Sequence, residues 1–245
     1  MINISNSDIY YKPYPYMLFK DVFDANFYNL LCSEFPKTNE LLKLDFDKKK
    51  NEYKQDKYFL TNLNKGFFQL INKKKNTKYL YEFLKSTLFL NQLINFLNNN
   101  NLRIKYNLNS GIVSKFKKLI FKKTDFTFEF SSISSKNGFI YPHTDGPDKI
   151  LTLIVPIISD PRIKNVKNVG TNILESLEDK YEYNFMNYAV PFESTKSVKE
   201  IPFSENQILM FIKTHNSLHS VGPMIDMDNN NLMRNSINFC IYNQN

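Results

Sequence analysis

Apolar residues in the first hundred positions recur mainly at the spacing of an amphipathic helix. A short extended segment is expected at 14–19, and Asp24 then stands where a helix N-cap would stand. Pro36 ends this first helix, whose apolar positions are Phe27, Leu30, Leu31 and Phe35. A shorter helix is expected at 67–71, and one or two helices are expected at 78–98. The intervening lysine-rich sequence predicts loops, so the first third of the chain is predicted to be mainly helical.

The pattern changes near Ile112, after which residues 126–130 show the period of two that marks a β-strand. Phe126, Phe128 and Phe130 alternate with polar residues, whereas 149–158 is almost continuously apolar, as expected for a strand buried on both faces. Further strands are expected at 138–145, 171–174, 208–212, 218–224 and 235–242. Because turn residues rather than helical segments separate these strands, they predict an antiparallel sandwich or barrel.

The stretch 175–203 interrupts this series of strands. Its aromatic residues, from Tyr181 to Phe192, lie among charged residues. Long insertions in compact domains are often lids or binding loops. A substrate lid and a packed surface excursion both fit this pattern.

The composition is ordinary for a soluble globular protein, with 42% hydrophobic and 23% charged residues. The formal net charge of +8 favours anionic partners. Nucleic-acid binding would require a basic stripe in a known module, and none is found, so no nucleic-acid partner is expected. Cys32 and Cys240 stand in no disulfide or zinc motif. Since no signal peptide or transmembrane run is found, we expect a soluble cytoplasmic protein without membrane contact.

The first candidate for metal chemistry is the segment Tyr141-Pro142-His143-Thr144-Asp145. In a strand, residues i and i+2 point to the same face, so His143 and Asp145 could converge on one ion. An imidazole and a carboxylate suit Fe(II). Taken alone, this motif fits a buried hydrogen-bonded pair better than a metal site.

The other two histidines, His215 and His219, follow the apolar strand at 208–212. Four positions along a strand separate them by about 13 Å, so they are not expected to bind the same ion. His219 falls inside a predicted strand, between Leu218 and Val221, and is preferred as the ligand. His215 lies in the preceding turn and is interpreted as a loop residue.

A third candidate, Arg234-Asn235-Ser236, opens the last predicted strand. Arg234 and Ser236 share one face by the same period of two. A guanidinium beside a hydroxyl is a good receptor for a carboxylate. An arginine that faces water at the end of a strand is the simpler alternative for this motif alone.

The order of these motifs resembles the 2-oxoglutarate and Fe(II)-dependent oxygenase superfamily, in its prolyl 4-hydroxylase-like branch. The resemblance extends over most of the chain. The segment 14–36 looks like the opening strand and helix of these proteins, and 149–153 resembles the strand after the iron motif. Gly170-Thr171 and the segment 216–221 are also similar to family segments. The combination is fairly specific, although no single segment is.

The resemblance implies a mostly β fold with flanking helices, built on a double-stranded β-helix (jelly-roll) core. We expect one oxygenase domain over 1–245. A helical N-terminal part, 1–110, would pack on the jelly-roll core, 111–245, which carries the insertion 175–203.

The resemblance also assigns site residues. His143, Asp145 and His219 match the iron ligands, and Arg234 matches the residue that pairs with the distal carboxylate of 2-oxoglutarate. Ser236 assists Arg234, and Thr152, on the strand after the iron motif, is also placed at the co-substrate. The implied cofactors are Fe(II), 2-oxoglutarate and dioxygen, with ascorbate as a candidate reductant.

Two features depart from the family pattern. Many relatives carry a co-substrate-binding tyrosine where this chain reads Val155-Pro156-Ile157. That contact is either missing or supplied elsewhere, with Tyr141 as the candidate. Arg234 also follows His219 after a longer connection than in relatives, and the extra residues fall in the polar stretch 226–231.

The favoured activity is hydroxylation of a C–H bond, with release of succinate and carbon dioxide. A cupin-like metal isomerase or hydrolase without 2-oxoglutarate is an alternative, as is a jelly-roll binding module without catalysis. A small molecule, a sugar or a peptide all fit as the substrate, and the positive net charge favours an anionic one. The sequence does not decide among them, because one architecture hosts many substrates.

Overall fold

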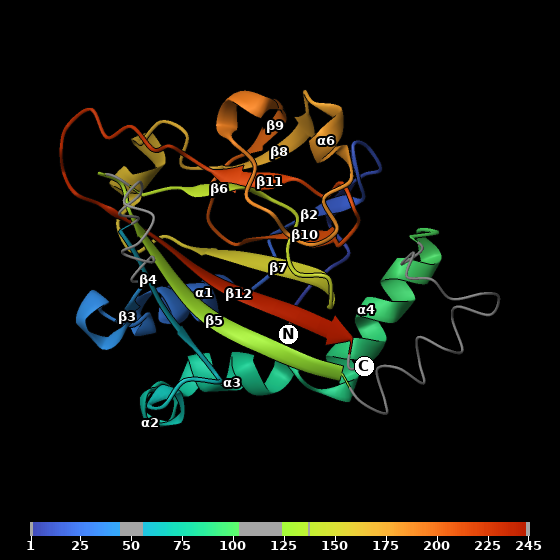
Figure 1. Cartoon of the computed structure of the whole chain (residues 1–245). Helices are drawn as coiled ribbons and strands as arrows, with labels where there is room; N and C mark the ends of the chain where they lie inside the picture. Colours follow the sequence, from blue (N-terminus) through green and yellow to red (C-terminus); the bar gives the residue numbers. More distant parts are fainter. Residues whose placement is uncertain (1, 45–55, 103–123, 137, 244–245) are drawn as a thin grey trace.

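The computed structural model describes residues 2–44, 56–102, 124–136 and 138–243. Two antiparallel sheets lie face to face, and helices cover the outer face of the larger sheet (Figure 1). The larger sheet has the strand order β1-β2-β10-β7-β12-β5-β4-β3. Its strands are β1 (Ser7–Tyr10), β2 (Tyr16–Lys20), β3 (Leu42–Lys43), β4 (Lys57–Thr61), β5 (Thr124–Ser134), β7 (Lys149–Ile157), β10 (Gln207–Ile212) and β12 (Met233–Asn243).

The smaller sheet has the order β6-β11-β8-β9. Its strands are β6 (Ile140–His143), β8 (Thr171–Ser176), β9 (Thr195–Ile201) and β11 (His219–Val221). The described helices are α1 (Ala25–Glu34), α2 (Phe67–Ile71), α3 (Lys75–Leu84), α4 (Thr87–Asn99) and α6 (Asp179–Glu182). Short 3-10 turns lie at η1 (Thr38–Glu40), η3 (Pro161–Asn165) and η4 (Phe192–Ser194).

The main core lies between the helices and the outer face of the larger sheet. Alternate residues of β12, such as Phe239, point to this side, and Phe239 packs edge-on against Phe89 of α4 at 6.3 Å between ring centroids. Edge-to-face packing is a favoured geometry for aromatic pairs. The opposite face of β12 carries Arg234 and Ser236 toward the smaller sheet. The alternation in β12 therefore separates the core from the side where polar chemistry gathers.

Helix α1 confirms the signals that predicted it. The Asp24 side chain accepts hydrogen bonds from the backbone N–H groups of Asn26 and Phe27, at 3.0 and 3.2 Å, as an N-cap does. The Tyr28 hydroxyl donates to the carbonyl of Pro156 on β7 at 3.1 Å. It also accepts from the N–H of Ile158 at 3.3 Å. These bonds fix α1 against the central strand that follows the predicted metal motif.

The N-terminal third contains the expected helices but also more strands than the one extended segment that the sequence predicted. It contributes β1 to β4 to the larger sheet, together with helices α1 to α4. Strand β4 pairs with β5, with Leu60 opposite Phe130, so this part of the chain extends the core sheet. The expected boundary near residue 110 lies outside the described residues.

The expected insertion 175–203 is shorter than predicted. Residues 195–201 form β9, which pairs with β8 and completes the smaller sheet. Most residues of β9 are exposed, because it is the edge strand of that sheet. The excursion outside the two sheets therefore spans 177–194. In the described residues, no helix combines the length and the apolar character that membrane crossing needs.

Candidate metal centre

Three side chains from two segments converge at one end of the smaller sheet. The metal-binding atoms of His143, Asp145 and His219 all lie within 4.8 Å of one another. His143 Nε2 is 3.6 Å from Asp145 Oδ1, and the two imidazole rings are 4.2 Å apart between centroids. Two imidazoles and one carboxylate on one side of a point form the donor set that holds non-haem Fe(II) and leaves positions open.

Strand pairing brings the two histidines together. His219 of β11 stands directly opposite His143 of β6 in the antiparallel register. Opposite residues in such a pair have neighbouring side chains on one face. The two histidines are 76 positions apart in the sequence, and the strand pairing brings them side by side.

Asp145 reaches the site differently from the prediction. The strand β6 ends at His143, so Asp145 is not its i+2 neighbour within a strand. Its backbone instead has a φ of 71°, in the left-handed region that aspartate tolerates better than most residues. This turn bends the carboxylate back toward the histidines. The expectation that the two residues cooperate agrees with the geometry, but the strand geometry offered for it was wrong.

Both imidazoles are oriented by backbone carbonyls. His143 Nδ1 lies 2.8 Å from the carbonyl of Tyr141, and His219 Nδ1 lies 2.9 Å from the carbonyl of Ser217. Since a carbonyl only accepts, each Nδ1 must carry the proton and donate it. The lone pair of each neutral ring is then on Nε2, the atom that is free to bind a metal.

Burial and neighbouring charges set the protonation states of His219 and Asp145. Burial, together with the neighbouring His143, lowers the pKa of His219 to about 3, so this ring is neutral near pH 7. Burial would raise the pKa of Asp145, but Lys149, His143 and His219 outweigh it and hold the pKa well below its ordinary value. The site therefore presents a neutral His219 imidazole and an ionised Asp145 carboxylate.

His215 lies outside this group. It is exposed, and its ring stacks on Tyr183 at 5.0 Å between centroids. Its carbonyl accepts a hydrogen bond from the N–H of Asn184. The geometry agrees with the choice of His219 over His215 as the ligand.

Arg234 lies on β12 and points across to the smaller sheet. Its Nε donates to the carbonyl of Val169 at 2.7 Å, and Nη2 donates to Thr171 Oγ1 at 3.2 Å. Its guanidinium carbon lies 4.5 Å from the centre of the Phe203 ring. Only 2% of the residue is exposed, and burial lowers its pKa to about 10. No carboxylate among the described residues pairs with this buried cation.

The comparisons with known proteins address the fold. No protein-family model matches the sequence, and no curated protein matches it. A solved prolyl hydroxylase from Trichoplax adhaerens, in complex with a hypoxia inducible factor peptide, matches with a TM-score of 0.54 at 10% identity. The match covers 93% of this chain and 83% of that one. A 2OG-Fe(II) oxygenase family protein from Caulobacter crescentus gives 0.50 at 11% identity, over 93% of this chain and 77% of that one.

The chain has the fold of the 2OG-Fe(II) oxygenases. The two antiparallel sheets agree with the jelly-roll core that this fold implies. The resemblance inferred from the sequence is thus confirmed for the fold, which by itself does not establish the activity.

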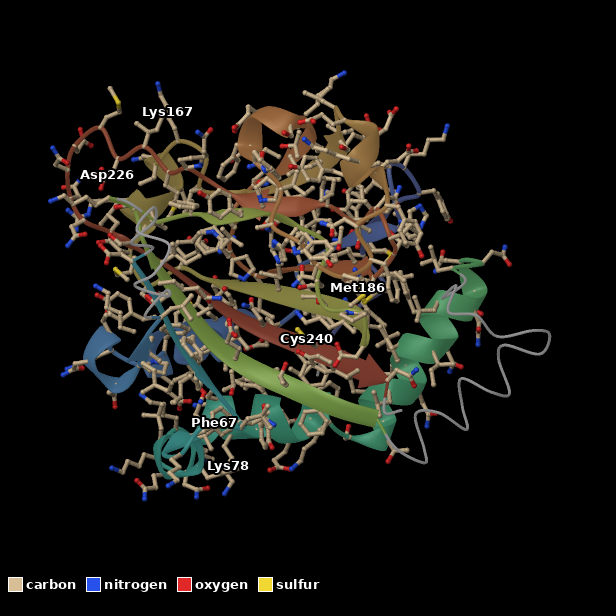
Figure 2. The ribbon with its side chains drawn as sticks, viewed as in Figure 1. Phe67, Lys78, Lys167, Met186, Asp226 and Cys240 are labelled. Atoms are coloured by element: carbon tan, nitrogen blue, oxygen red, sulfur yellow. The ribbon has the colours of Figure 1, made fainter. Side chains whose placement is uncertain are left out.

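In this oxygenase fold, Thr152 lies beside the carboxylate of Asp145, one of the three converging metal-binding side chains. Its hydroxyl donates to Asp145 Oδ2 at 2.8 Å, and Cys240 Sγ lies 3.6 Å from it (Figure 2 labels Cys240 on β12). The other oxygen, Asp145 Oδ1, accepts from Lys149 Nζ at 2.7 Å. The sequence reading assigned Thr152 to the co-substrate and did not single out Lys149 at all.

Ser236 and Tyr141 both contact neighbouring side chains. Ser236 is buried on the Arg234 face of β12, and its hydroxyl donates to Asn238 Oδ1 at 3.1 Å. The Tyr141 ring packs against Phe192 and Phe139, at 5.6 and 5.0 Å between centroids. The roles expected for both residues at a co-substrate stay predictions.

The longer connection between His219 and Arg234 forms a loop. It spans 222–232 between β11 and β12, and Figure 2 labels Asp226 on it. Asp226 accepts a hydrogen bond from the Ser135 hydroxyl at 2.8 Å, and Ile225 pairs with Lys167. The extra residues lie in this loop and not in either strand. Strand β12 therefore pairs with β5 in continuous register.

The excursion 177–194 is attached next to the metal group. The hydroxyl of Thr144, between the two motif residues, donates to the carbonyl of Asn184. Lys213 Nζ donates to Thr144 Oγ1 at 2.9 Å and to the carbonyl of Phe185 at 3.1 Å. Burial lowers the pKa of Lys213 to about 8. The excursion thus packs on the turn that carries Asp145, and sequence spacing contained no sign of Lys213.

Proposed function

We propose that this chain is an Fe(II)- and 2-oxoglutarate-dependent oxygenase that hydroxylates a C–H bond of its substrate. The observation that carries the proposal is the pairing of two features. His143, Asp145 and His219 form a metal-binding group, and the buried Arg234 has no carboxylate partner among the described residues. A buried charge without a counter-charge is costly unless a ligand supplies one.

The chain's residues would bind and orient the reactants. His143 and His219 would bind Fe(II) through Nε2, and Asp145 would bind it through a carboxylate oxygen. Bound iron supplies the activation of dioxygen that the chemistry requires. The overall reaction consumes the substrate C–H bond, dioxygen and 2-oxoglutarate. It yields the hydroxylated substrate, succinate and carbon dioxide, with one oxygen atom entering each organic product.

Arg234 would bind the distal carboxylate of 2-oxoglutarate. Two of the five N–H donors of a guanidinium are used by Val169 and Thr171, which fixes its plane and leaves donors for a ligand. A carboxylate would then find a receptor that is already ordered, so little entropy is lost on binding. Ser236 lies two residues further on the same face and would assist.

A cupin-like isomerase or hydrolase would use the same metal ligands without a co-substrate. Such a protein has no need for a buried arginine without a carboxylate partner on β12, the strand whose inner face points to the smaller sheet that carries the two histidines. Arg234 therefore favours the oxygenase over this alternative and over a binding module without catalysis.

The substrate is proposed only by class, as a peptide or a small molecule. The solved Trichoplax prolyl hydroxylase is in complex with a peptide. In this chain the excursion 177–194, with exposed Tyr183, Met186 and Tyr188, would form one wall of the substrate site. Figure 2 labels Met186 on this excursion.

The activity is tested by succinate release in the presence of Fe(II), 2-oxoglutarate and dioxygen. Release should require Fe(II) and should be lost in His143→Ala and Asp145→Ala. A matched control is His215→Ala, which changes a histidine outside the metal group and should keep release. Undiminished release from Asp145→Ala would refute the proposed metal site. Cell extract incubated with the enzyme should show an oxygen-dependent mass gain of one oxygen atom in the substrate.

A further inference from the structure

Both oxygens of the Asp145 carboxylate are already engaged. Lys149 Nζ is 2.7 Å from Oδ1, and the Thr152 hydroxyl donates to Oδ2 at 2.8 Å. The carboxylate is almost completely buried, with 5% of the residue exposed. An ionised carboxylate in such a place needs a cation nearby, because burial strongly disfavours an isolated charge.

Lys149 supplies that cation from the first position of β7. The turn at Asp145, with its positive φ, bends the chain back so that residue 149 meets residue 145. The ion pair is partly buried, since 19% of the Lys149 side chain and 7% of the Asp145 side chain are exposed. Pairs of this kind are screened less than pairs at the surface.

The ammonium contacts the same oxygen that faces the metal group. Asp145 Oδ1 is 3.6 Å from His143 Nε2, so it is the oxygen next to the metal-binding nitrogen of His143. A metal bound to that oxygen would lie within roughly 5 Å of the ammonium, given usual metal–oxygen distances. A divalent ion and an ammonium at that separation repel each other, and a partly buried site screens the repulsion poorly.

We propose that Lys149 is the counter-cation of the metal-free site and that it lowers the affinity of the site for a divalent metal. The inference rests on the proposed function in one respect, namely that the histidines and Asp145 bind a divalent ion. In the metal-free protein, Lys149 neutralises the buried carboxylate and keeps the turn folded. When a divalent metal binds, it neutralises the carboxylate in place of Lys149. The ammonium then repels the bound metal and lowers the affinity of the site for it.

Thr152 provides the opposite case on the other oxygen. Its hydroxyl is neutral, so it orients the carboxylate without repelling a cation. Removing the hydroxyl should therefore weaken metal binding, whereas removing the ammonium should strengthen it. The two partners of one carboxylate predict effects of opposite sign, which a purely structural role for Lys149 would not produce.

The test measures Mn²⁺ binding by the full chain, with free Mn²⁺ counted by electron paramagnetic resonance. Lys149→Met removes the charge and keeps an unbranched side chain, and it should bind Mn²⁺ roughly tenfold tighter or more than the wild type. Lys149→Arg keeps the charge and should retain the wild-type affinity. Thr152→Val should bind Mn²⁺ several-fold more weakly, on the order of one lost hydrogen bond to a charged group.

Thermal unfolding gives a second readout that does not depend on activity. Metal-free Lys149→Met should unfold at a lower temperature than the wild type, because the buried carboxylate has lost its cation. Saturating Mn²⁺ should raise its unfolding temperature by more than it raises that of the wild type. Lys149→Gln, a second neutral variant, should behave in the same way.

Unchanged or weaker Mn²⁺ binding by folded Lys149→Met would overturn the inference and leave the proposed function intact. Failure of both neutral variants to fold in saturating Mn²⁺ would also overturn it, because the bound ion should replace the missing cation. Two other outcomes would instead refute the proposed metal site itself. In the first the wild-type chain binds no Mn²⁺, and in the second the wild type and the His219→Ala variant bind Mn²⁺ with equal affinity. The two failures are therefore distinguishable.

Discussion

The guanidinium of Arg234 on β12 donates to Thr171 Oγ1 on β8 at 3.2 Å, so that one side chain joins the two sheets. The bond from its Nε to the carbonyl of Val169 fixes the group from a second direction. The arginine is therefore held by the fold before any ligand arrives. A receptor ordered in this way is expected to bind a carboxylate with little reorganisation.

Replacing Arg234 tests this role directly. Arg234→Met should weaken 2-oxoglutarate binding roughly 30-fold or more, as expected for loss of one partner from a buried charge pair. Calorimetry of the Mn²⁺-loaded protein measures the affinity without turnover. The matched control is Arg162→Met, because Arg162 is exposed and pairs with Asp160 at the surface. Equal 2-oxoglutarate affinity in both variants would remove the argument for a co-substrate.

The two histidines of the 214–221 segment should differ sharply. His219→Ala should lose divalent-metal binding, because its Nε2 is one of the three converging donors. His215→Ala should bind metal as the wild type does, since its ring is exposed and stacks on Tyr183. Calorimetric titration of each variant with a divalent metal distinguishes the two variants. The reverse result, with metal lost only in His215→Ala, would show that the ligand was chosen wrongly.

The depressed pKa of His219 makes stability depend on pH. Its folded pKa, about 3, lies below the ordinary value of 6.5, so the unfolded chain binds the extra proton first as the pH falls. The free energy of unfolding should therefore decrease as the pH falls below the ordinary histidine pKa, by about 2 kcal/mol between pH 6.5 and 5. Urea unfolding of the metal-free protein at pH 7 and pH 5 measures it. His219→Asn should reduce this loss, and an identical loss in both proteins would contradict the assignment.

The contact between α1 and β7 should contribute to stability. Tyr28→Phe removes the hydroxyl that donates to Pro156 and accepts from Ile158, and it leaves those buried groups without this partner. The free energy of unfolding should fall by about 1–3 kcal/mol. Tyr79→Phe is the control, because Tyr79 is largely exposed and its change should stay within about 0.5 kcal/mol. Urea unfolding of both variants decides, and equal stabilities would show that the Tyr28 hydroxyl does not stabilise the fold.

Local patterns predicted the elements whose side chains alternate or are buried. Strand β5 followed from its alternating phenylalanines, and β7 and β10 followed from continuous apolar runs. Helices α3 and α4 followed from apolar spacing, and Asp24 predicted the start of α1. In each case the signal lies within one element, so neighbours in space were not needed.

Two strands at or next to a sheet edge, β4 and β9, were missed or misplaced for a physical reason. Strand β4, with the sequence Lys57–Thr61, sits in a polar and lysine-rich stretch. Strand β9 is largely exposed and carries no apolar period. Such strands are held by backbone pairing to a neighbour that the local sequence does not reveal, whereas hydrophobic periodicity records only burial.

The residue types at the metal group were available from the sequence, because only certain side chains bind iron and the chain has three histidines. The sequence also supplied Arg234 as a carboxylate receptor. Their arrangement was decided by tertiary structure: the β6–β11 register that sets His143 against His219, the left-handed turn that returns Asp145, and the placement of Lys149 and Thr152 on its two oxygens. Side-chain chemistry is a property of each residue, whereas distance between residues far apart in the chain arises only when strands pair and sheets pack.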